Sequence, residues 1–184
     1  LSSKEEVPVL AVRCLTSTPL GAAFPEMEIK LGSTRGTNAI LEKKGAKTAF
    51  LVTKGFKDLL LIGNQQRPDL FTVRVKKIPP LYEAVLEVDE RIASDGSVIA
   101  ALSSESLLRL TAQLQKRGIQ SVAIALLNSY KNPSHEQHLA SYLRKAGFRY
   151  VSVSHELSGQ IKLLTRAETT VANAYLDPII HNYI

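Results

Sequence analysis

Short apolar runs alternate with amphipathic stretches along this chain, and this pattern constrains the fold more than any other feature. The runs KTAFLVT (residues 47–53) and SVAIALL (residues 121–127) are bounded by turn residues, which is typical of central strands. The clearest succession is a helix at 103–117, a strand at 121–127, a helix at 133–146 and a strand at 150–154. The sequence therefore predicts an α/β fold with a mixed, largely parallel sheet and flanking helices.

Other elements are less regular. Residues 85–92 and 98–100, joined by an Asp-Gly turn, predict a β-hairpin near 85–100. A long helix is expected from about Thr165, strained or ended at Pro178. The first 31 residues show two strand-like runs, of which Met27 to Leu31 alternates like a half-buried strand.

Composition bounds the class of protein. A length of 184 residues suits one α/β domain, and no apolar run approaches the ~20 residues that span a bilayer. The net charge is +6, but Lys and Arg are scattered and only 6% of residues are aromatic, so neither nucleic acid nor membrane is expected as a partner. Cys14, the single cysteine, is expected to be a small buried hydrophobe, which fits a reducing, cytoplasmic setting. The chain does not begin with Met, so we expect it to start within a longer protein.

The segment GSTRGTN (residues 32–38) has two interpretations. It is either an ordinary glycine turn before a helix capped by Thr37 or Asn38 and ended by Gly45, or a phosphate site. Backbone N–H groups at a helix start attract anions, and hydroxyl groups donate to phosphate oxygens. The residues alone favour the turn, because Gly-Lys-Ser/Thr is missing from the segment.

Three further groups of polar residues are candidates. In QQRPDLF, Arg67 can clamp a carboxylate or phosphate beside Asp69, although a solvent-facing turn is the simpler interpretation. In NPSHEQH, a metal site is disfavoured against a surface helix start that carries Glu136, because His135 and His138 lack a third ligand nearby. The last group is a polar stripe that faces either water or a site; its members are Arg166, Thr169, Thr170 and Asn173.

Taken together, these segments resemble a known family. Four stretches are similar, in order and spacing, to the N-terminal region of the hydantoinase A / 5-oxoprolinase family over roughly residues 8–180. The stretches are LGSTRGTNAILEKKGAKTAFLVTKGFKDLLLIGNQQRPDLF, LYEAVLEVDERIASDGSV, GIQSVAIALLNSYKNPSHEQHLASYLR and RAETTVANAYLDPII. The opening residues and QQRPDLF look most like the ATP-dependent 5-oxoprolinase branch.

The resemblance implies part of an actin-like, two-lobed ATPase that uses ATP and Mg²⁺. The implied reaction converts 5-oxoproline, ATP and water to glutamate, ADP and phosphate. The implied partners are 5-oxoproline or a hydantoin-type small molecule, a hydantoinase B-like hydrolytic half in the same chain or as a subunit, and further copies in a homo-oligomer of the intact protein. The family's upstream Asp-x-Gly-Gly-Thr phosphate loop does not occur in residues 1–184, so this chain alone is expected to be inactive.

Site roles follow from the resemblance as hypotheses. Thr34, Gly36, Thr37 and Asn38 are expected to line the phosphate or substrate cleft, and Arg67 and Asp69 to hold a substrate carboxylate or order a loop. The Arg166, Thr169, Thr170 and Asn173 group is placed near the hinge between lobes, and His135 and Glu136 are interpreted as structural. No residue is assigned to catalysis or to metal binding.

Two alternatives stay open from the sequence. One keeps the family but makes the substrate a hydantoin or N-methylhydantoin, because the residues do not report ring substituents. The other is a non-catalytic, actin-like module that binds a partner.

Replacing Thr37 or Asn38 by Ala in the intact enzyme is expected to lower turnover sharply, because each would remove a polar group from the cleft. Phosphate release from ATP is the measurement, and unchanged turnover would remove both residues from the site.

Overall fold

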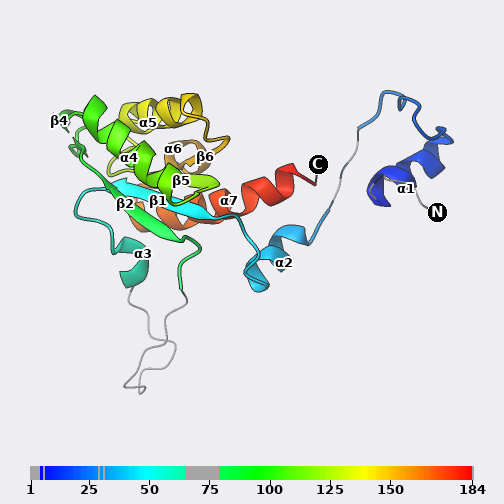
Figure 1. Ribbon diagram of the computed structural model, residues 1–184, viewed down its shortest axis with the longest axis horizontal. Helices are drawn as coiled ribbons and strands as arrows, with labels where there is room; N and C mark the ends of the chain where they lie inside the picture. The colour runs from blue at the N-terminus through cyan, green and yellow to red at the C-terminus, as the bar shows by residue number, and fades with distance from the viewer. Residues whose placement is uncertain (1–4, 6, 29, 31, 65–78, 184) are drawn as a thin grey trace, which may run out of the picture. The chain divides into compact units, whose positions relative to one another are not determined.

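The computed structural model describes residues 5, 7–28, 30, 32–64 and 79–183. It separates the chain into two compact units, Leu1–Ser33 and Thr34–Ile184, and the predicted α/β layout lies in the second. Figure 1 labels the elements. The second unit contains α2 (Arg35–Leu41), β1 (Thr48–Thr53), α3 (Leu59–Ile62), β2 (Ala84–Val88), β3 (Arg91–Ile92), β4 (Val98–Ala100), α4 (Ser104–Lys116), β5 (Ser121–Ala125), α5 (Ser134–Lys145), β6 (Tyr150–Val153), α6 (Ser154–Leu157) and α7 (Leu163–His181).

The first unit differs from its prediction. Its opening strand-like run is the helix α1 (Val7–Thr16), which begins with a proline in the first turn, where the missing N–H costs nothing. The described residues among Met27 to Leu31 form no strand. Cys14 lies on α1 and is exposed, so the expectation that it is buried was wrong.

Arg13 organises the described part of this first unit. Its guanidinium binds both carboxylate oxygens of Glu5, at 2.7 and 2.8 Å, and donates to the carbonyls of Pro19 and Ala22 at 2.7 and 2.9 Å. It also lies 4.4 Å from the centre of the Phe24 ring. These contacts connect α1 to the loop that follows it, and the hydrogen bonds from Arg13 lower the pKa of the Glu5 carboxyl group.

The core of the second unit is a four-stranded sheet in the order β2-β1-β5-β6, with every neighbouring pair parallel. The two central strands are buried along their whole length, as their continuous apolar runs predicted. The α/β prediction is thus confirmed for the described residues, with the main sheet wholly parallel. The assignment to an actin-like lobe stays a prediction.

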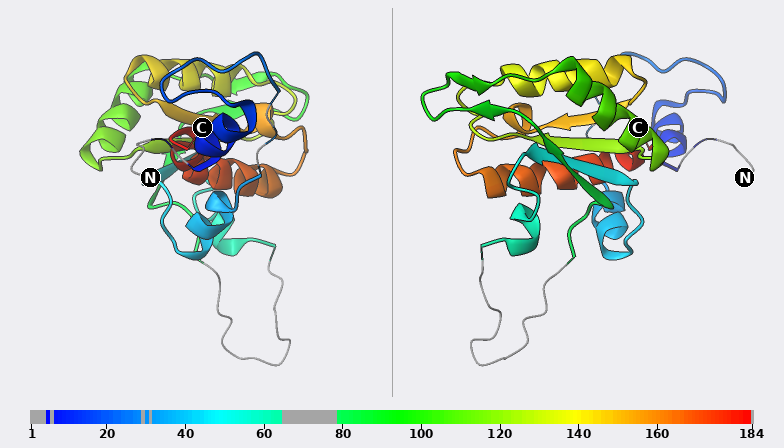
Figure 2. Two further views of the ribbon diagram at one scale, coloured as in Figure 1. Left: turned by 90° about the vertical axis from the view of Figure 1, so that its right-hand side faces the viewer. Right: turned by 60° about the vertical axis from the view of Figure 1, so that its left-hand side comes forward.

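Helices cover both faces of this sheet, and the views in Figure 2 show the three layers. On one face, Leu107, Leu110 and Leu114 of α4 pack with Leu139 and Leu143 of α5 against the strands. On the other face α7 is the main cover, together with α3. Full burial of each such aliphatic side chain contributes about 1.5–3 kcal/mol. Among the described residues, none of the helices has the length and apolar character that crossing a membrane requires.

The predicted hairpin near 85–100 is only partly correct. Ala84–Val88 is not a hairpin arm but the edge strand β2 of the parallel sheet, and only Arg91–Ile92 pairs antiparallel with Val98–Ala100. The turn forms at Asp95-Gly96 as predicted, with Gly96 at φ 93°. Apolar residues recur on both sides of Asp89 and Glu90, at Leu86, Val88 and Ile92, so periodicity alone did not reveal the break between the two segments.

Some helix ends also differ from those that the sequence predicted. α2 begins at Arg35, with Thr34 at the cap position but without a capping side-chain hydrogen bond, and it ends before Gly45. Ser103 caps α4 as predicted, accepting from the Ser106 N–H. α7 does not end at Pro178 but continues to His181.

Gly45→Ala is expected to destabilise the chain by about 1–3 kcal/mol through overpacking. A Cβ at Gly45 would lie 1.9 Å from the ring of Tyr175, which is buried at the C-terminal half of α7. Urea unfolding measures the effect. Gly159→Ala is the matched control, since a Cβ there meets nothing within 4 Å, and equal unfolding midpoints for the two variants would contradict the prediction.

Candidate functional site

The candidate site lies at the carboxyl edge of the parallel sheet. From β1 the chain crosses to β2 by way of α3 on one face, whereas α4 and α5 on the other face lead to β5 and β6. The direction of travel along the sheet therefore reverses between β1 and β5. Ligands of open α/β sheets bind outside the carboxyl ends of the strands at this switch point. The two switch-point loops here are residues 54–58 and residues 126–133.

Buried Glu136 holds the start of the second loop. Its Oε1 accepts the Leu126 N–H at 2.7 Å and the Ser154 hydroxyl at 2.6 Å, while its Oε2 accepts the His155 N–H at 3.0 Å and His155 Nδ1 at 2.7 Å. An ionised carboxylate only accepts, so Nδ1 of His155 carries the hydrogen. Four donors thus satisfy a fully buried charge and join the ends of β5 and β6.

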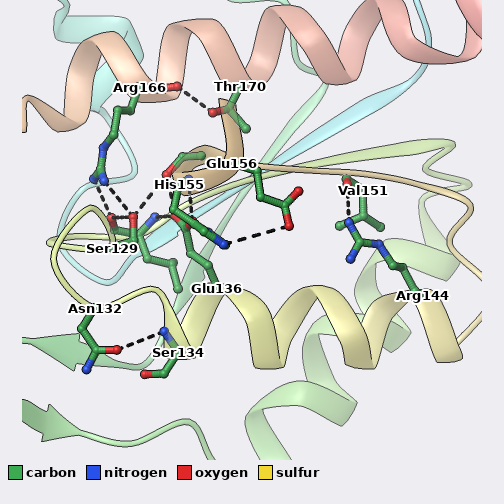
Figure 3. Close-up of polar contacts among 12 residues, drawn as sticks. Ser129, Asn132, Ser134, Glu136, Arg144, Val151, His155, Glu156, Arg166 and Thr170 are labelled. Atoms are coloured by element: carbon green, nitrogen blue, oxygen red, sulfur yellow. Dashed lines mark hydrogen bonds and ion pairs between the residues drawn. The ribbon is translucent and has the colours of Figure 1, made fainter. Parts of the chain in front are cut away.

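Arg166 of α7 holds the same backbone from the other side (Figure 3). Its guanidinium donates to the Leu126 carbonyl at 2.9 Å and to Ser129 Oγ at 2.8 Å, and it lies 5.6 Å from the Tyr130 ring centre. The Ser129 and Ser154 hydroxyls are 3.2 Å apart, so two serines connect this cation to Glu136. Burial lowers the pKa of Arg166, and the Glu136 carboxylate opposes that shift.

A second buried carboxylate, that of Glu90, belongs to a series of hydrogen bonds that spans the switch point. Thr53, the last residue of β1, donates its hydroxyl to Glu90 Oε1 and accepts the Leu127 N–H at 2.8 Å. His135 Nδ1 lies 2.6 Å from Glu90 Oε2 and, facing a carboxylate, carries the hydrogen. The chain His135–Glu90–Thr53–Leu127 therefore links α5, the segment after β2, β1 and the second switch-point loop.

The first switch-point loop is held by residues of β2 and β3. Glu87 accepts the Gly55 N–H at 2.7 Å, and Arg91 donates to the Lys54 carbonyl at 3.1 Å and lies over the Phe56 ring at 5.6 Å. The Lys54 and Asp89 side chains, both more than 60% exposed, are 3.4 Å apart. This edge thus presents an exposed lysine and an exposed carboxylate beside the buried hydrogen bond between Thr53 and Glu90.

The small hairpin is fastened to the second loop. Asn128 Nδ2 donates to the Ile92 carbonyl at 2.8 Å, and Asn132 Nδ2 donates to the Gly96 carbonyl at 2.8 Å. Asn132 Oδ1 also accepts the Ser134 N–H at the start of α5. These hydrogen bonds join the hairpin to the loop after β5.

The predicted site residues do not all come together. Thr34, Thr37 and Asn38 are exposed at α2, where Gly36 packs near Leu176 and Ile180 in the C-terminal half of α7. Arg166 lies in the first turn of α7, roughly 15 Å along the helix from Leu176 at 1.5 Å per residue. The ligand-binding roles of the α2 residues stay predictions. Arg67 and Asp69 lie outside the described residues.

The polar stripe of α7 contains both buried and exposed residues. Arg166 and Thr170 are buried, and Thr170 donates its hydroxyl to the Arg166 carbonyl at 2.6 Å. Thr169 is exposed and bonds back to Thr165, while Asn173 donates to Ser152 of β6 at 2.9 Å. The stripe is therefore neither wholly a solvent face nor wholly a site, because Arg166 and Thr170 point into the protein and Thr169 points out.

His135 and Glu136 do not lie at a surface helix start, because the residues are 7% and 0% exposed. Their interpretation as structural stays a prediction. Sequence reasoning missed Thr53 and Glu90. Their signal was a polar residue at or just after the end of a strand, Thr53 as the last residue of β1 and Glu90 two residues after β2, since the carboxyl ends of parallel strands meet at one edge.

In the described residues, metal-ligating side chains do not gather into a site. This described part of the chain contains no group of three or more His, Cys, Asp or Glu side chains placed to hold a metal ion. A hollow of about 680 Å³ exists, but it lies at the amino edge beside Gln120, Arg149 and the end of α7, away from both buried carboxylates. Among buried side-chain atoms of the described residues, Tyr82 Oη and Arg166 Nε lack a hydrogen-bond partner.

Glu136→Gln is expected to destabilise the chain by about 3–5 kcal/mol, because the amide brings new donors to a buried site whose neighbours are all donors. Urea unfolding measures the loss. The control is Glu156→Gln, the same chemical change on a side chain that is 54% exposed, for which a change within about 0.5 kcal/mol is expected. Similar midpoints for both variants would show that Glu136 does not hold this edge.

Comparison with known proteins agrees with this architecture. A family model described as "Hydantoinase/oxoprolinase N-terminal region" matches residues 4–147. The 5-oxoprolinase of Saccharomyces cerevisiae is 39% identical across 85% of this chain and 14% of its own length. The 5-oxoprolinase 1 of Arabidopsis thaliana is 36% identical across 100% of this chain and 17% of its own length. The chain therefore spans only 14–17% of these curated relatives.

Solved structures agree as well. The ATP-dependent caprolactamase of Pseudomonas jessenii superposes with a TM-score of 0.71 at 32% identity, covering 83% of this chain and 23% of that one. A nucleotide-free acetone carboxylase shares the fold, with a TM-score of 0.68 at 22% identity over 78% of this chain. The sequence match and the shared fold together show that the chain belongs to the hydantoinase/oxoprolinase family, whose N-terminal region it represents.

Proposed function

We propose that this chain is part of an ATP-dependent cyclic amide hydrolase that acts on 5-oxoproline. The observation that carries the proposal is the 39% identity, across 85% of the chain, to a protein named 5-oxoprolinase. A relative named as the alpha subunit of a caprolactamase, 35% identical over 83% of the chain, supports the wider class of lactam substrates.

The chemistry explains why such an enzyme would need ATP. A lactam carbonyl is a poor electrophile, because the ring nitrogen donates electron density to it. Phosphorylation of the amide oxygen would create a good leaving group, and water would then attack the carbon. Proteins that transfer phosphoryl groups work mainly by positioning and by neutralising charge with Mg²⁺.

Gly36, the glycine expected to line the phosphate cleft, is not required by the protein atoms around it. A Cβ at Gly36 would make only ordinary contacts of 3.6 and 3.7 Å, so no backbone approach there demands glycine. The exposed Asp89 carboxylate is a suitable ligand for a hydrated Mg²⁺ ion. A single carboxylate holds this ion only together with phosphates and water. We therefore assign no chemical step to this chain, and we propose that other parts of the intact protein bind most of ATP and Mg²⁺.

The proposed contribution of this chain is a preformed carboxyl edge beside the reaction. Its buried carboxylates and Arg166 fix the switch-point loops, and the exposed Lys54 and Asp89 side chains take no part in those contacts. A hydrolytic half, in the same chain or as a subunit, would complete ring opening. The caprolactamase subunit among the relatives supports such a division of labour.

Phosphate release by the intact protein tests this proposal. Mg-ATP is supplied with 5-oxoproline, with a hydantoin, with caprolactam or with no amide, and stimulation by 5-oxoproline is expected. Stimulation only by the hydantoin or caprolactam would keep the class of reaction and change the substrate. No stimulation by any of the three would contradict a cyclic amide hydrolase.

A further inference from the structure

One residue, Thr53, connects the two switch-point loops. It is the last residue of β1, it is fully buried, and the first switch-point loop begins at the next residue, Lys54. Its hydroxyl oxygen accepts the N–H of Leu127 in the second loop at 2.8 Å. A shift of the second loop relative to the end of β1, where the first loop begins, therefore has to break this hydrogen bond.

The direction of the hydrogen bonds is fixed by Glu90. A buried carboxylate accepts only, so the Thr53 hydroxyl must donate to it, which leaves the oxygen of Thr53 as the acceptor for Leu127. His135 Nδ1 donates to the other oxygen of Glu90 at 2.6 Å and prevents the carboxylate from turning. Each hydrogen bond in the series His135–Glu90–Thr53–Leu127 therefore has a single donor and a single direction.

Thr48 at the opposite end of the same strand shows what a purely structural threonine does. It is as buried as Thr53, at 1% against 0% exposed, and its hydroxyl donates to the nearby Ala46 carbonyl at 2.9 Å. That contact spans two residues of one segment, whereas the contacts of Thr53 span 37 and 74 residues. The two threonines differ in what they connect, not in burial.

We propose that Thr53 and Glu90, oriented by His135, are positioning residues that hold the two switch-point loops in register for the bound cyclic amide substrate. The kinetic part of this inference rests on the function proposed above. Both residues are buried, at 0% and 2% exposed, so each would act through the loop backbone rather than by contact with the substrate. Misplacing reacting groups by about 1 Å can cost on the order of a hundredfold in rate.

The kinetic test compares Thr53→Val, Thr53→Ser and Thr48→Val in the intact protein, assayed with 5-oxoproline and Mg-ATP at a temperature where all are folded. Thr53→Val keeps the shape but loses both hydrogen bonds, so kcat/KM is expected to fall by about tenfold or more. Thr53→Ser keeps the hydroxyl and is expected to stay within about threefold of the wild type, and Thr48→Val within about twofold. Equal kcat/KM for Thr53→Val and Thr48→Val would overturn the proposal.

Amide hydrogen exchange separates this inference from the proposed function. In the 184-residue chain, Thr53→Val is expected to speed exchange at Leu127 and in both loops by about tenfold, whereas Thr48→Val leaves them unchanged. If Thr53→Val does not fold, Glu90→Gln tests the same series of hydrogen bonds in both assays. An intact wild-type protein that no cyclic amide stimulates would refute the proposed function alone. Unchanged exchange at Leu127 would refute the positioning role whatever the activity.

Discussion

Much of the second unit depends on how two buried, opposite charges share the backbone of Leu126. Glu136 accepts its N–H and Arg166 donates to its carbonyl, so the first residue after β5 is held from both faces of the sheet. The charges do not touch; Ser129 and Ser154 lie between them. An unpaired buried charge costs several kcal/mol, so each ion requires the other and the hydroxyls between them.

This arrangement explains why α5 begins as it does. Consecutive residues of a helix point about 100° apart, so His135 and Glu136 reach different neighbours from one turn. His135 turns towards Glu90 and the hairpin, and Glu136 towards the ends of β5 and β6. The first turn of α5 thereby connects segments that follow three parallel strands. A preorganised edge of this kind suits an enzyme, because loops fixed before binding need not be ordered during the reaction.

Local pattern predicted the elements whose environment is uniform. The strands at Thr48–Thr53 and Ser121–Ala125 are buried on both faces, and nothing interrupts their apolar runs. Pattern failed at Val7–Thr16, a short apolar run that is equally compatible with helix and strand. It also failed at Ala84–Val88, since strand pairing depends on partners about 35 residues away that a local window does not contain.

The sequence by itself determined the α/β class, the family and the main core, because the spacing of apolar residues and the order of the motifs are properties of neighbouring positions in the chain. Only the tertiary structure decided which polar residues meet. Thr53, Glu90 and His135 are separated by 37 and 45 positions, yet parallel strands bring their carboxyl ends to one edge. It also turned Arg166 inward and left Thr169 exposed on the same helix. Helical spacing places residues on a face, but packing against the sheet decides which face is buried.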